Sequence, residues 1–95
     1  MVMLQTDFVI AANYRVPGLG VLVLPADPAP GWLADHALHT ALSVTLLIDG
    51  QPPSLLNGTV EELSRNDQIP QRAFLLDFAP DDDLPLGTRL RIMES

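Results

Sequence analysis

Alternating apolar and polar positions run through most of the chain and predict β-strands. Between residues 7 and 16, one face of a strand would carry Phe8, Ile10, Ala12, Tyr14 and Val16. A period of two is typical of a half-buried strand. The same period recurs in residues 43–49, 73–78 and 89–93, whose apolar faces would carry Val44, Leu46, Ile48, Phe74, Leu76, Phe78, Leu90 and Ile92. Each of these segments is predicted to be a strand.

Two further strands complete the predicted set. Residues 21–24, Val-Leu-Val-Leu, are apolar throughout, and their short length and β-branched content favour a strand over a helix. A sixth strand is expected around residues 55–63. We expect irregular segments around residues 25–40, which begin with a proline-rich stretch, and around residues 64–71. Within the first of these, residues 32–40 would form a short helix or stay irregular.

Glycine and proline mark the corners between the strands. Residues 16–19, Val-Pro-Gly-Leu, fit a type II turn, because proline presets φ at the second position and glycine supplies the positive φ at the third. Gly20 would let the returning backbone bulge or pass close to its neighbour. Asp49-Gly50 predicts a second turn. Asn57-Gly58 is predicted to be a bulge rather than a hairpin tip.

Short strands separated by glycine- and proline-containing turns predict an all-β fold. The predicted fold is a small six-stranded antiparallel barrel that is closed or nearly closed. The 95 residues suffice for one domain with a single core, spanning residues 1–95. Hydrophobic residues make up 47% of the chain and charged residues 18%, as in ordinary globular domains.

The charge of the chain restricts its partners. The chain has twelve acidic residues, five arginines and no lysine, and its net charge is -7. A nucleic acid would meet repulsion, so it is not the expected partner, whereas a protein with a basic surface would be attracted. The absence of cysteine removes thiolate chemistry and sulfur-ligated metal sites. No cofactor is predicted. The first ten residues lack the basic head of a secretory signal, and no apolar run reaches the ~18 residues of a membrane span, so we expect a cytoplasmic protein.

Three stretches, "RVPGLGVLV", "GTVEEL" and "DDLPLGTRLRI", give the chain a resemblance to the barrel-shaped second domain of elongation factor Tu and related translational GTPases. In that family a strand enters a Gly-basic-Gly turn and leaves as an apolar strand, a place that Gly18, Leu19 and Gly20 take here. The resemblance implies a six-stranded barrel, such as small single-domain bacterial proteins of this type would have. It also suggests a translation accessory that binds RNA or the ribosome.

The chain departs from that family in three respects. The family's Gly-Asp step before the third strand has no counterpart around residues 38–43. Leu19 replaces the basic residue of the glycine turn, and a phosphate-binding Gly-x-x-x-x-Gly-Lys-Ser/Thr loop is absent from the sequence. The resemblance to this family therefore concerns the fold alone, and a shared fold does not imply a shared function.

Candidate chemistry is sparse. His36 and His39 would share one face of a helix and could bind a metal with a third ligand, which would suit a small metal-dependent enzyme, but surface histidines are the favoured interpretation. Asp81, Asp82 and Asp83 form an acidic stretch that is better suited to attracting a basic partner than to binding calcium. No serine lies in a nucleophile motif, so an enzyme is not predicted.

Trp32 has two interpretations. It would act as a lid that plugs an open end of the barrel, or it would be an exposed anchor for a partner, because tryptophan is enriched at interface hot spots. We predict that four residues bind the partner: Trp32, Asp81, Asp82 and Asp83. The expected function is a non-catalytic acidic module that binds another protein; an immunity protein that neutralises a basic toxin would be one such case.

Overall fold

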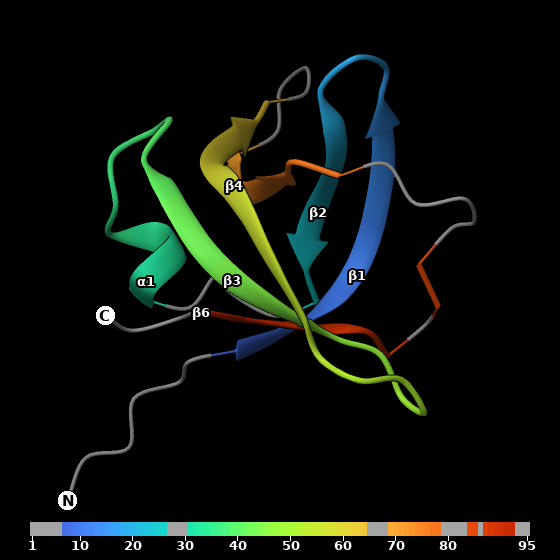
Figure 1. The fold of residues 1–95 in the computed structure, drawn as a ribbon. Helices are drawn as coiled ribbons and strands as arrows, with labels where there is room; N and C mark the ends of the chain where they lie inside the picture. The colour runs from blue at the N-terminus through green and yellow to red at the C-terminus, as the bar shows by residue number, and fades with distance from the viewer. Residues whose placement is uncertain (1–6, 27–30, 65–68, 79–83, 86, 93–95) are drawn as a thin grey trace, which may run out of the picture.

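The computed structural model describes residues 7–26, 31–64, 69–78, 84–85 and 87–92. Within these residues, six strands form a closed antiparallel barrel in the order β1-β2-β5-β4-β3-β6 (Figure 1). The elements are β1 (Asp7–Val16), β2 (Gly20–Pro25), α1 (Gly31–Ala34), β3 (Ala41–Leu47), β4 (Ser54–Leu63), β5 (Gln71–Leu76) and β6 (Arg89–Ile92). This confirms the predicted all-β fold, and it is compatible with a barrel like that of elongation factor Tu.

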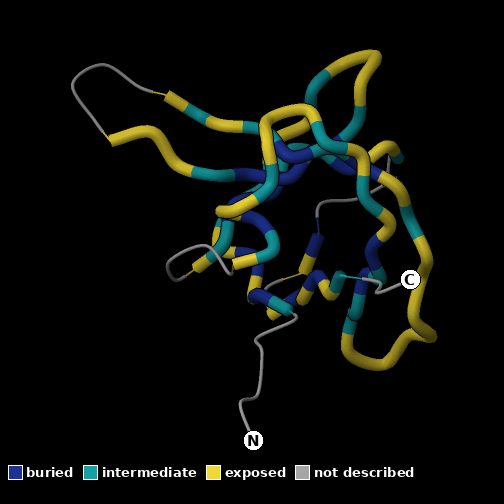
Figure 2. Tube along the Cα trace, turned by 90° about the vertical axis from the view of Figure 1, so that its left-hand side faces the viewer, coloured by how far each residue is buried: buried dark blue, intermediate teal, exposed yellow. Residues whose placement is uncertain are grey.

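The predicted apolar faces fill the barrel. Figure 2 shows buried positions along the strands and exposed ones in the turns. The core consists of Phe8, Ile10, Val21, Val23, Leu33, Val44, Leu46, Val60, Phe74, Leu76, Leu84 and Leu90. Ile48 and Phe78 lie just beyond their strands but still pack against this core. At about 25 cal/mol for each Å² of buried apolar surface, this shared interior is the main stabilising contribution to the fold.

The second half of β1 does not follow the predicted alternation. The pairing of β1 with β2 shifts its register between Ile10 and Ala12. Beyond the shift Tyr14 stands opposite Leu22 on the outer face and is 44% exposed, whereas Arg15 stands opposite the buried Val21. Opposed residues share a face of the sheet, so an extra residue in one strand exchanges the two faces. The prediction that Tyr14 points inward was therefore wrong.

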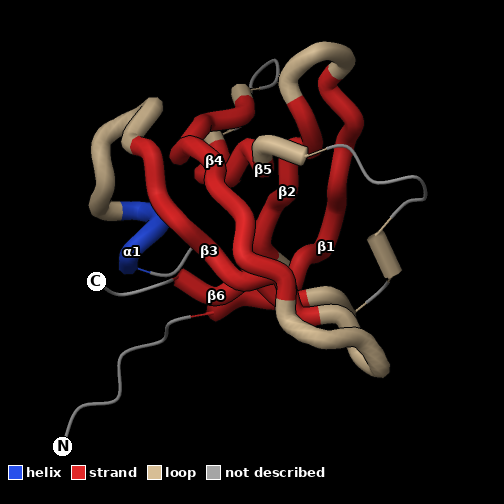
Figure 3. The backbone as a smooth tube through the Cα atoms, in the orientation of Figure 1, coloured by secondary structure: helices blue, strands red, loops and turns tan. Residues whose placement is uncertain are grey.

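A short helix closes one end of the barrel. Because all neighbouring strands are antiparallel, the starts of β1, β3 and β5 meet at the same end, where α1 lies (Figure 3). Leu33 of α1 is fully buried, and Trp32 stacks on Phe8 with ring centroids 5.8 Å apart. Trp32 also meets the edge of Phe74 at 5.9 Å. Residues 32–40 were predicted to form a short helix or to be irregular. The structure has one helical turn at the start of this segment, followed by bends and turns.

The turn chemistry is largely as predicted. The amide of Leu19 donates to the carbonyl of Val16 at 2.9 Å, and Gly18 has a φ of +81°, as a type II turn requires. Gly50 has a φ of +79° in the turn between β3 and β4. The predicted bulge at Asn57-Gly58 was wrong, because β4 pairs there in an unshifted register with both β3 and β5.

Among the described residues, none of the helical structure has the length and hydropathy that crossing a membrane requires.

Candidate functional site

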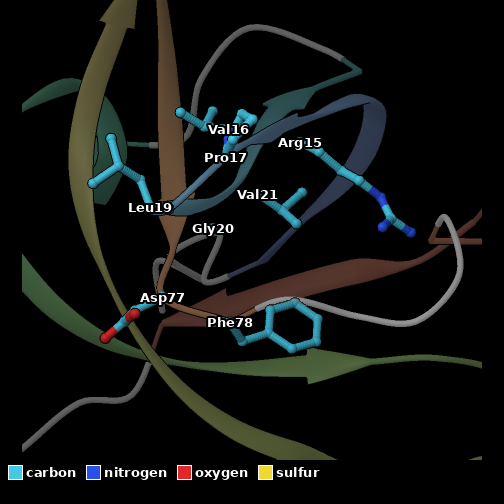
Figure 4. A pocket seen from close by; sticks show the side chains of 9 residues that line it. Arg15, Val16, Pro17, Leu19, Gly20, Val21, Asp77 and Phe78 are labelled. Atoms are coloured by element: carbon cyan, nitrogen blue, oxygen red, sulfur yellow. The ribbon is translucent and has the colours of Figure 1, made fainter.

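The β1–β2 turn stands beside a hollow at the end of the barrel opposite α1. This hollow, about 460 Å³ in volume, is called here the turn hollow; it is lined by Arg15, Val16, Pro17, Gly18, Leu19, Gly20, Val21, Asp77 and Phe78 (Figure 4). Most of this described lining is apolar, with one arginine and one aspartate as its charged residues. Beyond the register shift of β1, Arg15 stands opposite Val21 near the end of the strand, where it is exposed.

A second hollow lies on the outer surface of the barrel, on the other side of the same turn. It measures about 350 Å³ and is called the strand hollow; its lining is Leu19, Ala41, Asn57, Gly58, Thr59, Leu75 and Asp77. Thr59, Ala41 and Leu75 face outward together because they are directly paired across β3, β4 and β5.

Leu19 and Asp77 line both hollows. Leu19 is 61% exposed at the tip of the turn, a high value for a large aliphatic side chain. Figure 4 shows Leu19 and Asp77 on one side of the turn hollow and Arg15 extending from the other side. The two hollows therefore adjoin at an exposed leucine and a carboxylate; we call the two hollows together the Leu19 surface.

Asp77 carries a carboxylate on this surface that forms no ion pair with the described residues. Its backbone amide donates to the carbonyl of Asn57 at 2.9 Å, which fixes the chain where β5 ends. Its side chain is exposed and makes no ion pair with any residue in the described part of the chain. An exposed carboxylate in this position can accept hydrogen bonds from a lysine or arginine of another molecule.

Three arginines of the barrel, Arg72, Arg89 and Arg91, fall into two separate groups. Arg89 and Arg91 on β6 both lie near Asp7, at 3.9 and 3.2 Å. Arg72 on β5 lies 3.9 Å from Glu62 and donates to the carbonyl of His36 at 3.0 Å. Since β5 and β6 are three positions apart in a closed ring of six strands, these groups lie on opposite sides of the barrel.

The histidines His36 and His39 contact different parts of the structure. Nδ1 of His36 donates to the carbonyl of Trp32, whereas Nδ1 of His39 lies 3.1 Å from Oε2 of Glu61. The same carboxylate oxygen accepts a hydrogen bond from Thr59 at 2.8 Å. His39 has a φ of +71° and a 77% exposed side chain. No group of three potential metal ligands occurs among the residues whose positions are described.

The sequence-predicted partner-binding residues are not brought together by the structure. Trp32 packs over the core as a lid, and its Nε1 atom is buried without a hydrogen-bond partner among the described residues. Asp81, Asp82 and Asp83 lie outside the described residues. The binding role of all four stays a prediction. The Leu19 surface was missed, although one signal for it was present: an aliphatic residue at the tip of a tight turn, where a polar residue is usual.

Comparison of the chain with models of protein families, with curated proteins and with solved structures finds no match.

Proposed function

We propose that this protein is a non-catalytic module that binds another protein through the Leu19 surface. The observation that carries the proposal is that one exposed leucine divides two largely apolar hollows of about 460 and 350 Å³. An exposed apolar surface with a polar rim is typical of protein-interaction sites. The described linings are mostly apolar and carry few polar side chains, which suits contact with a protein surface; the polar ones are Arg15, Asn57, Thr59 and Asp77.

The charge of the chain favours a basic partner. The net charge is -7, and three of the arginines lie beside carboxylates of the chain itself. The resulting negative potential would accelerate the encounter with a positively charged protein, while the apolar hollows would determine how long the complex lasts. The acidic stretch at residues 81–83 follows Phe78 in the sequence and would add to this potential.

The resemblance to the second domain of elongation factor Tu stays a proposal about the fold. The turn at residues 18–20 supports it, because a Gly-x-Gly corner here joins the first two strands of a six-stranded barrel. The RNA-binding function that the resemblance suggests is less well supported. RNA binding would need a continuous basic face, whereas Arg72 on β5 lies on the opposite side of the barrel from Arg89 and Arg91 on β6.

The test begins with affinity capture from a lysate of the cells that produce the protein, using the full chain and a Leu19→Ser variant. A matched control is Leu55→Ser, because Leu55 is 66% exposed but lies on β4 outside both hollows. We expect a protein that is retained by the wild type and by the Leu55 variant and is lost with the Leu19 variant. Equal retention by all three chains would contradict the use of this surface.

The electrostatic part of the proposal is tested on the captured protein. Its association rate constant should fall severalfold between about 50 and about 200 mM salt, since screening shortens the reach of exposed charges. A rate constant that does not change over this range would rule out steering by net charge. Capture of RNA instead of protein, sensitive to ribonuclease, would favour the translation-associated alternative.

A further inference from the structure

The Leu19 surface has the chemistry to recognise one particular kind of protein segment. We propose that it binds an extended segment in which a large apolar side chain stands two positions from a lysine or arginine, so that both point to the same side. In this arrangement the apolar side chain enters the turn hollow and the cation pairs with Asp77. The inference rests on the proposed function and deepens it, because it specifies what the partner must present.

The shape of the surface favours a chain segment over a small molecule. Both hollows are open to solvent, and they share Leu19 and Asp77, so they continue into one another around the turn. A small ligand is usually held in a cavity that encloses most of its surface. Two adjoining open hollows instead suit alternate side chains of an extended segment, which point to the same side, so that one can enter each hollow while the backbone crosses Leu19.

The lining of the turn hollow determines the apolar part of the recognition. Val16, Pro17 and Phe78 contribute apolar surface, and Phe78 is half-buried against the barrel core, which fixes its ring (Figure 4). Pro17 is held in a hydrogen-bonded type II turn. Because these groups are already ordered, an incoming apolar side chain would bind without the entropic cost of ordering the hollow.

Asp77 determines the charge of the segment. It lies on the rim common to both hollows, it is exposed, and it pairs with no cation in the described part of the chain. Because Asp77 lines the turn hollow itself, one segment can both fill the hollow with an apolar side chain and place a lysine or arginine beside Asp77. An acidic or neutral segment would leave the carboxylate without a partner where the complex excludes water, which disfavours it.

The inference is tested by selecting peptides from a random twelve-residue library displayed on phage against the immobilised full chain. We expect enriched peptides to carry a lysine or arginine two positions from Leu, Ile, Met, Phe or Trp. Binding of the corresponding synthetic peptides should weaken about five- to tenfold in Asp77→Asn and tenfold or more in Leu19→Ser. Circular dichroism and urea unfolding of both variants should match the wild type, because both side chains are exposed.

Two control variants separate local from general effects. Asp49→Asn removes the same charge from an exposed turn outside the hollows, and Leu55→Ser removes the same side chain from β4; neither should weaken binding more than about twofold. Enriched peptides without a basic residue, or equal losses in Asp77→Asn and Asp49→Asn, would overturn the inference. If capture of a protein from the lysate still depends on Leu19, the proposed function survives that outcome.

Discussion

The carbonyl oxygen of Leu76 lies so close to Gly20 that a Cβ on Gly20 would stand less than 3.0 Å from it. Gly20 also has a φ of +136°, a conformation that side chains rarely permit. The contact occurs where β2 leaves the turn and begins to pair with β5, beside the pair Val21–Leu76. The start of β2 can therefore approach the end of β5 this closely because Gly20 has no side chain, and the same corner presents Leu19 and Asp77.

Gly20→Ala should destabilise the protein by about 3 kcal/mol or more, since both the backbone conformation and the overlap with a carbonyl oppose a methyl group. Gly18→Ala is the matched control. Gly18 has a φ of +81°, but no atom of the described residues lies within 4 Å of the place a Cβ would take, so only the conformational cost of about 1–2 kcal/mol applies. Urea unfolding followed by circular dichroism measures both. Equal losses of stability would show that the close approach to β5 is unimportant.

Gly58 and Phe74 form a second close contact, inside the barrel. A Cβ on Gly58 would stand 2.9 Å from Cζ of Phe74 and closer still to the carbonyl of Leu75. Gly58→Ala should cost about 1–3 kcal/mol by overpacking, and Phe74→Leu about 1 kcal/mol. The double variant should cost at least about 0.5 kcal/mol less than the sum, because the shorter side chain makes room. Rescue should be partial, since the carbonyl of Leu75 remains. Strict additivity in the thermodynamic cycle would contradict this packing.

Local pattern predicted the strands because each has one face on a common core. The first strand was predicted with its observed bounds, Asp7–Val16, and the turn at residues 16–19 with its hydrogen bond. The exposure of Tyr14 was not predictable, because the register shift after Ile10 depends on which strand pairs with β1, and local alternation does not contain that information. Gly58 was misinterpreted for a related reason: its neighbours Leu75 and Phe74 come from another strand.

The candidate site was less predictable than the fold. Leu19 was visible in the sequence as an unusual residue between two glycines, but Asp77 reads as an ordinary polar residue at the end of a strand. The pairing of β2 with β5, which are distant in the sequence, brings the end of β5 beside the β1–β2 turn, so that both residues line the same hollows. A surface assembled from distant segments depends on the order in which the strands pair. A sequence motif can reveal a site only when its residues lie in one segment.

Arg72 should stabilise the segment that connects α1 to β3. Its guanidinium donates to the carbonyl of His36 at 3.0 Å, across 36 positions of sequence. Arg72→Met should cost about 1–2 kcal/mol, because a partly buried carbonyl loses a charged donor. It should also increase acrylamide quenching of Trp32, the single tryptophan of the chain. Arg89→Met serves as the control: Arg89 is more exposed, its carboxylate partner is 3.9 Å away, and the expected loss is below about 0.5 kcal/mol. Equal effects of the two substitutions would argue against the link to His36.

Trp32 provides a test of the lid itself. Its indole stacks on Phe8, yet its Nε1 atom is buried and finds no hydrogen-bond partner in the described part of the chain. A buried donor of this kind costs about 1–3 kcal/mol, whereas loss of the whole side chain from an apolar contact costs about 3–5 kcal/mol. Trp32→Phe keeps most of the stacking surface and removes the donor, so its stability should lie within about 1 kcal/mol of the wild type. Trp32→Ala should lose about 3 kcal/mol or more in urea unfolding followed by far-ultraviolet circular dichroism. If Trp32→Phe were as damaging as Trp32→Ala, the indole nitrogen would have to make a stabilising interaction, and Trp32 would be held by polar contacts rather than by packing alone.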